Sequence, residues 1–210
     1  MGNEANARAP LADERAGGYR VFAKPRMGRL AVWHLVLFAL IGSSPRTSWT
    51  QSKADEYHVK AAFLFHFAQL VEWPAASFGG GNSFDLCTLG DDPFQGELER
   101  TVEGKRIGAR ILHIRHLSEL QVARGCHMVF ISKSEDKRLA AMLAGVRGSP
   151  VLTVGEADNF LGSGGMIRLC LEGNKVRFEI NREAAESAGL RISATLLLLA
   201  RNLTGGSGEH

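Results

Sequence analysis

The chain has 210 residues, of which 45% are apolar and 22% are charged. This is the composition of an ordinary globular protein and is enough for one well-buried domain. The formal net charge of +3 comes from the first 50 residues, because the remainder holds 18 Lys and Arg against 19 Asp and Glu. The charge distribution therefore argues against nucleic-acid binding.

The N-terminal segment has the pattern of an export signal. An apolar run covers residues 30–42, which is shorter than the roughly 20 residues that a spanning helix needs and fits a secretory signal. Met27 and Arg29 precede it as a start residue and a basic region. We predict that residues 1–50 are an N-terminal extension and a cleaved signal peptide, with the true start at Met27 and export from the cytoplasm. An uncleaved anchor or a buried strand are the alternatives.

A long helix is predicted to open the folded domain. It begins near residue 57 and ends at Trp73, because Pro74 disfavours helical geometry at the residue before it. The stretch 75–83 contains Gly79-Gly80-Gly81 and is predicted to be a loop.

Strands and short helices alternate after this loop. The predicted strands are 84–89, 110–115, 127–132 and 150–154. The predicted helices are 94–102, with Asp92 as cap, 117–123 and 134–146, followed by a helical turn at 156–161.

Residues 165–171 and 175–180 alternate around Glu172-Gly173-Asn174, which predicts a hairpin. Helices at 181–188 and 193–203 complete the chain. The pattern predicts a single α/β domain at residues 51–205, with a mainly parallel sheet, an antiparallel C-terminal hairpin and helices on both faces. Residues 206–210 are predicted to be a flexible tail.

Residues with catalytic or metal-binding potential do not form a recognisable site. Asp91 and Asp92 follow a strand, where a Mg²⁺ site is possible, but the expected third acidic residue is absent and a capped turn is favoured. His113 and His116 are predicted on opposite faces of one strand, which disfavours a shared metal. No nucleophile elbow and no phosphate-binding loop are present. We predict no enzymatic activity, no metal and no cofactor.

The three cysteines are Cys87, Cys126 and Cys170. With a strand order of 2-1-3, Cys87 in the first strand and Cys126 at the entry to the third strand lie on neighbouring strands. A disulfide between them is then geometrically feasible, and two buried free thiols are the alternative. Cys170 is interpreted as a buried small side chain, although an unpaired thiol in an oxidising compartment can also link two chains.

Five stretches together resemble the YfiR-like family: KAAFLFHFAQLVEWP, LCTLGDDPF, GSPVLTVGEADNF, GGMIRLCLEGNKVRFEIN and AGLRISATLLLLARNL. The resemblance covers about residues 57–203. It implies a periplasmic, often dimeric α/β protein without enzymatic activity. Such a protein represses an inner-membrane diguanylate cyclase by binding its periplasmic sensory part, which lowers cyclic di-GMP and opposes biofilm formation. A periplasmic small-ligand receptor or an α/β enzyme is the alternative.

The resemblance also bears on the cysteines. Cys87 and Cys126 match one family disulfide by position. A second pair occurs in some members, but Cys170 has no cysteine nearby in residues 158–165. Redox switching through a second bridge is therefore not expected.

The opening helix carries the candidate partner surface. We predict that its core stripe consists of Val59, Ala62, Phe63, Phe67, Leu70 and Trp73. Leu64, Phe65 and His66 then lie away from this stripe and are the candidate partner or dimer surface. The alternative is that the C-terminal helix with Leu196–Leu199 covers Leu64 and Phe65.

Overall fold

A computed structural model describes residues 48–118 and 120–204 of the chain. The predicted extension and signal peptide, up to residue 47, and the predicted tail lie outside the described residues. No helix in the described part is both long enough and apolar enough to span a bilayer.

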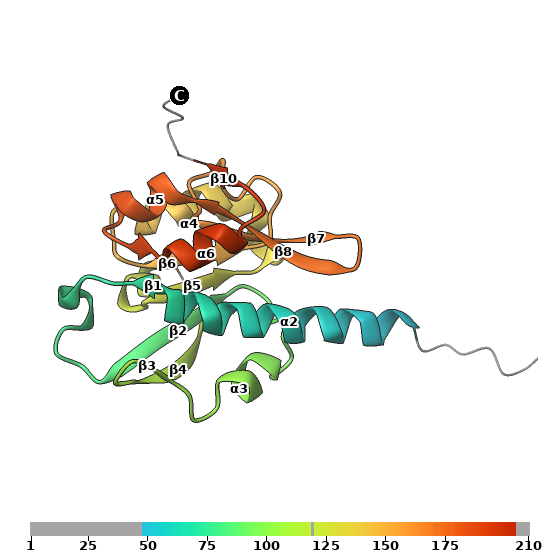
Figure 1. Ribbon diagram of the computed structural model, residues 1–210, viewed down its shortest axis with the longest axis horizontal. Coiled ribbons are helices and arrows are strands. Elements are labelled where there is room, and N and C mark those ends of the chain that lie inside the picture. The colour runs from blue at the N-terminus through green and yellow to red at the C-terminus, as the bar shows by residue number, and fades with distance from the viewer. Residues whose placement is uncertain (1–47, 119, 205–210) are drawn as a thin grey trace, which may run out of the picture. The chain divides into compact units, whose positions relative to one another are not determined.

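An eight-stranded sheet in the order β10-β8-β7-β6-β5-β2-β4-β3 forms the centre of the domain (Figure 1). Its strands are β2 (Ser83–Leu89), β3 (Arg106–Ile107), β4 (Arg110–Leu117), β5 (Met128–Ile131), β6 (Leu152–Gly155), β7 (Ile167–Glu172), β8 (Lys175–Asn181) and β10 (Leu203–Thr204). The pairs β3·β4 and β7·β8 are antiparallel, and the other neighbours are parallel. The predicted α/β class, the 2-1-3 order of the first three predicted strands and the C-terminal hairpin are confirmed.

Helices cover both faces of this sheet. On one face lie α2 (Ser48–Leu70), α3 (Glu97–Val102) and α6 (Ala194–Leu199); on the other lie α4 (Leu139–Val146) and the 3-10 segments η2 (Leu120–Gly125) and η3 (Lys133–Arg138). A further helix, α5 (Arg182–Ser187), follows β8, and the 3-10 turn η1 (Ala75–Phe78) precedes β2. A separate antiparallel pair joins β1 (Val71–Glu72) to β9 (Arg191–Ile192).

The central strands are apolar on both sides because both faces are covered. In β5, Met128 and Phe130 belong to the core under α2, whereas Val129 and Ile131 belong to the core under α4. All four side chains are at most 2% exposed.

Helix α2 differs from its prediction in extent and in orientation. It begins before residue 57 and ends at Leu70, and the chain then enters β1. Its buried positions include Ala61, Leu64 and Phe67, whereas Val59 is 41% exposed. The predicted stripe is therefore wrong at Val59, and Leu64 belongs to the core. The reason is that apolar residues occur on nearly every side of this helix, so spacing alone did not select the buried face.

Several shorter helices are also truncated. The last helix ends at Leu199 because Ala200 is extended and leads toward β10. Helix α3 starts only at Glu97, since Gln95 has a positive φ of 52° that interrupts helical geometry. The Asp92 carboxylate accepts a hydrogen bond from the Phe94 N–H at 2.9 Å and so stabilises a turn instead of capping α3.

Candidate functional site

A pocket of about 370 Å³ opens beyond the carboxyl end of β6. Strand β6 stops at Gly155, while its neighbour β7 continues from Arg168 to Glu172 and pairs there with β8. The pocket lies at this step in the sheet, with α2 alongside it. The carboxyl ends of parallel strands are the usual position for ligands in open α/β sheets. Its lining residues are Glu56, Tyr57, Lys60, Lys133, Glu156, Asp158, Arg168, Leu169, Cys170, Leu171 and Arg201.

A buried ion cluster forms the α2 side of the pocket. Lys60 is only 4% exposed, and its ammonium group contacts the carboxylates of both Glu56 and Glu156. The Tyr57 hydroxyl donates to the second Glu156 oxygen at 3.2 Å, and the Lys60 nitrogen lies 4.4 Å from the Tyr57 ring centre. Burial, assisted by the nearby Glu156 carboxylate, raises the pKa of Tyr57. The cluster therefore fixes α2 to the end of β6.

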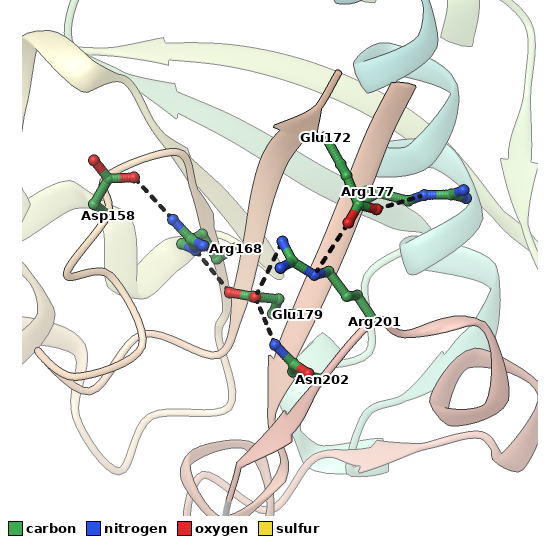
Figure 2. A network of polar contacts seen from close by, with 7 residues as sticks. All are labelled: Asp158, Arg168, Glu172, Arg177, Glu179, Arg201 and Asn202. Atoms are coloured by element: carbon green, nitrogen blue, oxygen red, sulfur yellow. Dashed lines mark hydrogen bonds and ion pairs between the residues drawn. The ribbon is translucent and has the colours of Figure 1, made fainter. Parts of the chain in front are cut away.

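A second network lies on the hairpin (Figure 2). Arg168 donates to Glu179 at 2.8 Å and to Asp158 at 2.9 Å, and Asn202 donates to Glu179 at 3.0 Å. Burial alone would raise the pKa of Glu179, but the bonds from Arg168 and Asn202 outweigh burial and lower it. The bond to Glu179 in turn raises the pKa of Arg168. Both groups are thus held in their charged forms.

Arg201 approaches the same network less closely. Its guanidinium lies 3.8 Å from a Glu172 oxygen and 4.0 Å from a Glu179 oxygen (Figure 2). These separations exceed hydrogen-bond distance, so Arg201 retains free donors. Lys133, which follows β5, has no ion-pair partner within the described part of the chain.

The structure joins Cys87 to Cys126 by a disulfide, with the Cα atoms 6.1 Å apart. This is the predicted pairing; it connects β2 to the chain just before β5. The predicted free thiol, Cys170, is half-buried and lines the pocket. It is therefore not the fully buried side chain that alternation indicated.

The three residues of the candidate partner surface occupy different environments. Leu64 is 0% exposed and is part of the core on the α2 face, so its side chain is not available to a partner in this conformation. Phe65 is half-buried, and the Lys105 ammonium lies 4.3 Å from its ring centre. His66 is exposed and lies 3.3 Å from the Gln69 side chain. Of the three, Phe65 and His66 remain accessible.

The covering helix suggested for Leu64 is only partly involved. In α6, Leu196 is buried in the same core, but Leu198 is 87% and Leu199 is 64% exposed. The two exposed leucines of α6 therefore cover neither Leu64 nor Phe65.

The other candidate residues are engaged in local contacts. His116 contacts the Thr88 hydroxyl and the Glu99 carboxylate, and the Asp91 N–H donates to the Ser134 hydroxyl. His58 pairs with Glu97, whose pKa is lowered mainly by its bond from Arg100. No cluster of three or more metal-binding side chains occurs in residues 48–118 or 120–204.

Sequence reasoning did not identify the pocket residues. Lys60 was visible as a lone charge in an apolar helix, and Arg168 and Glu179 were visible as opposite charges at paired hairpin positions. Their convergence with Glu156 depends on where β6 ends relative to α2, and local pattern does not contain that information.

Together, these features define an α/β domain with an open sheet, one structural disulfide and a polar pocket at the carboxyl ends of the strands. A model of the YfiR/HmsC-like family matches residues 57–201, and the chain belongs to this family. Membership suggests a regulatory protein of the periplasm connected with diguanylate cyclase signalling.

Solved structures resemble the chain in fold. A conserved domain protein from Vibrio cholerae O1 biovar El Tor strain N16961 superposes with a TM-score of 0.51 at 10% identity, covering 69% of this chain. The match spans 60% of the length of that Vibrio protein. An ABC domain from Streptococcus pneumonia, solved with L-Trp, gives a TM-score of 0.44 at 8% identity, covering 59% of this chain and 56% of its own. The first similarity supports the fold, and the second carries no argument.

Proposed function

We propose that the protein is a periplasmic regulator that binds the periplasmic sensory part of an inner-membrane diguanylate cyclase and represses it. Repression lowers cyclic di-GMP and opposes biofilm formation. The observation that carries this proposal is the family match over residues 57–201, which extends from α2 to just beyond α6.

Two features support the periplasmic location. The Cys87–Cys126 disulfide is of a kind that persists in oxidising compartments and is rare in the cytosol. The apolar run at residues 30–42 is directly preceded by the basic residue Arg29, and this pattern fits a cleaved export signal.

We place the partner or dimer surface on the exposed side of α2, around Phe65 and His66. Helix α2 also leaves Val59 exposed, two turns before His66 on the same side of the helix. Partly exposed aromatic rings are enriched at contact surfaces.

Deletion of the gene tests the function directly. Cyclic di-GMP is expected to rise in the deletion strain and to return to its original level when the wild-type gene is restored. Restoration with Phe65→Glu is expected to leave cyclic di-GMP high, whereas restoration with Leu198→Glu, at an exposed position of α6, is expected to lower it.

An unchanged cyclic di-GMP level in the deletion strain would contradict repression of a cyclase. A Phe65→Glu protein that folds, keeps its oligomeric state in solution and restores repression would remove the α2 surface from the proposal. Folding of both variants is verified by circular dichroism before the comparison.

The pocket supports a second candidate, a periplasmic small-ligand receptor. Its volume of about 370 Å³ lies within the range of small-molecule sites. Thermal shift measurements with periplasmic extracts separated by size test this candidate, because a receptor is stabilised by a small-molecule fraction.

A further inference from the structure

The pocket beyond β6 contains an unpaired strand edge. Strand β6 pairs with β7 only as far as Gly155 and Arg168. From Leu169 to Glu172, β7 pairs with β8 alone, and no other described strand pairs with its opposite edge. The peptide groups along that edge face the pocket.

Two residues of β7 supply these peptide groups. The hairpin turn has Gly173 at a φ of 60°, and the flanking pair Glu172–Lys175 closes it. In an antiparallel ladder, hydrogen-bonded and non-hydrogen-bonded pairs alternate. Cys170 therefore bonds to β8, while Leu169 and Leu171 direct their N–H and C=O groups away from β8. The parallel pair Gly155–Arg168 is bonded through the residues on either side of Arg168, which uses the Leu169 N–H. The groups left unpaired on this edge are therefore the Leu169 C=O and the N–H and C=O of Leu171. This explains why both leucines line a polar pocket, although Leu169 is only 1% exposed.

The charges around this edge favour an anionic group. The acidic side chains of the pocket are each engaged: Glu56 and Glu156 contact Lys60, and Asp158 accepts from Arg168. Lys133 is a lining cation without an ion-pair partner among the described residues, and Arg201 lies 3.8 Å and 4.0 Å from the Glu172 and Glu179 carboxylates, too far for a hydrogen bond. A guanidinium with free donors matches the geometry of a carboxylate.

The two cations reach the pocket from different elements. Lys133 follows β5, the other neighbour of β6, so a chain in line with β6 would have β7 on one side and Lys133 on the other. The backbone of Arg201 lies on the β10 side of β8, where its N–H donates to the Phe178 carbonyl, and its side chain extends toward Glu172 of β7 and Glu179 of β8. Both residues line the same pocket as Leu169 and Leu171.

We propose that this pocket binds an extended acidic peptide segment of a protein partner, which adds as a strand to the open edge of β7. Its main-chain groups bond to Leu169 and Leu171, and its carboxylate binds Lys133 and Arg201. Main-chain pairing with selective side-chain contacts is an established mode of peptide recognition. The proposal deepens the proposed function, on which it rests for the identity of the partner as the regulated membrane protein.

A random octapeptide display library selected on the purified protein is the probe. Selected peptides are expected to be rich in Asp or Glu and to bind measurably in fluorescence anisotropy. Leu171→Pro removes one outward N–H and leaves the bonds to β8 intact, so it is expected to weaken binding by about tenfold or more. Leu171→Thr is the matched control and is expected to bind as the wild type does.

The charges are tested by Lys133→Glu combined with Arg201→Glu, which is also expected to weaken binding by about tenfold or more. In hydrogen exchange, the amide of Leu171 is expected to become protected when peptide is bound, whereas the amide of Leu169, which pairs with β6, is expected to change little. Peptides N-methylated at alternate residues are expected to lose binding to the wild-type protein, which tests strand addition even if Leu171→Pro does not fold.

Three outcomes would overturn the proposal. The first is a library that yields no binding peptides, and the second is peptides whose binding survives both N-methylation and Leu171→Pro. The third is saturable binding of inorganic phosphate or succinate that depends on Lys133 and Arg201 while peptides do not bind, which would make the pocket a small-anion site. These measurements need no cyclase, so peptide binding with unchanged cyclic di-GMP in the deletion strain would retain the site and reject the proposed function.

Discussion

The Asp85 backbone N–H donates to Nδ1 of His127 at 3.0 Å, which holds the imidazole between the rings of Phe78 and Phe84. The ring centres lie 4.7 Å and 5.1 Å from that of His127. Its Nε2 atom is buried and has no hydrogen-bond partner among the described residues. Burial lowers the pKa of His127 and outweighs Asp85 and the Ser77 backbone, which raise it; Arg110 acts in the same direction as burial.

A loss of stability in mild acid follows from this arrangement. Because the folded state disfavours the imidazolium form, the contribution of neutral His127 is complete above the unfolded pKa near 6.5 and is lost as pH falls through the lower folded pKa. The free energy of unfolding is expected to fall by up to about 1.4 kcal/mol per pH unit in that window. Urea titrations of the wild type and His127→Gln between pH 7.5 and 5 measure the difference. The exposed His66→Gln is the control, and an equal slope in His127→Gln and the wild type would contradict the assignment.

Reduction of the disulfide is expected to destabilise the domain strongly. Cys87 and Cys126 are 39 positions apart, and the chain-entropy model gives about 4 kcal/mol for a closed loop of this size. Denaturant unfolding of the Cys87→Ser/Cys126→Ser variant measures this loss. Cys170→Ser is the control and is expected to unfold near the wild-type midpoint. A double variant as stable as the wild type would show that the bridge does not stabilise the fold.

Lys60→Met is expected to lower the free energy of unfolding by about 3–5 kcal/mol, because it leaves the Glu156 carboxylate buried without its cation. The Glu156 side chain is only 8% exposed. Adding Glu156→Gln to Lys60→Met is expected to recover part of the loss, since the uncompensated charge is then removed. Thermal unfolding of the two variants, with Glu56→Gln as a more exposed control, provides the comparison. If the double variant were less stable than Lys60→Met, charge burial would not be the cause.

Leu64→Ala is expected to destabilise the fold by about 2–5 kcal/mol, as deletions in a packed core do. Leu198→Ala changes the same side chain at an 87% exposed position and is expected to stay within about 0.5 kcal/mol of the wild type. Urea unfolding of both variants measures the contrast. Equal effects would place Leu64 outside the core and restore it as a surface candidate.

The sequence predicted the features that depend on short-range pattern. Alternation and turn residues identified the β7–β8 hairpin, and the order of the first strands followed from the α/β pattern. Strand order then brought Cys87 and Cys126 onto neighbouring strands, which is the pairing in the structure. The 3-10 segments η2 and η3 were predicted as α-helices, since residue propensities distinguish 3-10 helices from α-helices poorly.

The missed features depend on contacts between distant segments. Gly155 and Gly165 lie on either side of the Phe160 ring, and a Cβ atom built on either glycine would be 2.2 Å from a ring carbon. Sequence alone marks these glycines only as turn or strand-end residues. The orientation of Leu64 was missed for a similar reason, because the core that accepts it includes side chains of β2, β5, β6, β7 and β8, all distant in the sequence.

Helix α2 carries the proposed Phe65 surface and also forms one wall of the peptide pocket. Lys60 fixes it to β6 beside the peptide pocket, and Phe65 lies about 8 Å further along the helix axis. A peptide that displaces α2 at Lys60 therefore moves Phe65 with it. If the two sites are coupled in this way, the coupling is reciprocal: a partner bound at Phe65 changes peptide affinity by the same factor by which the peptide changes partner affinity.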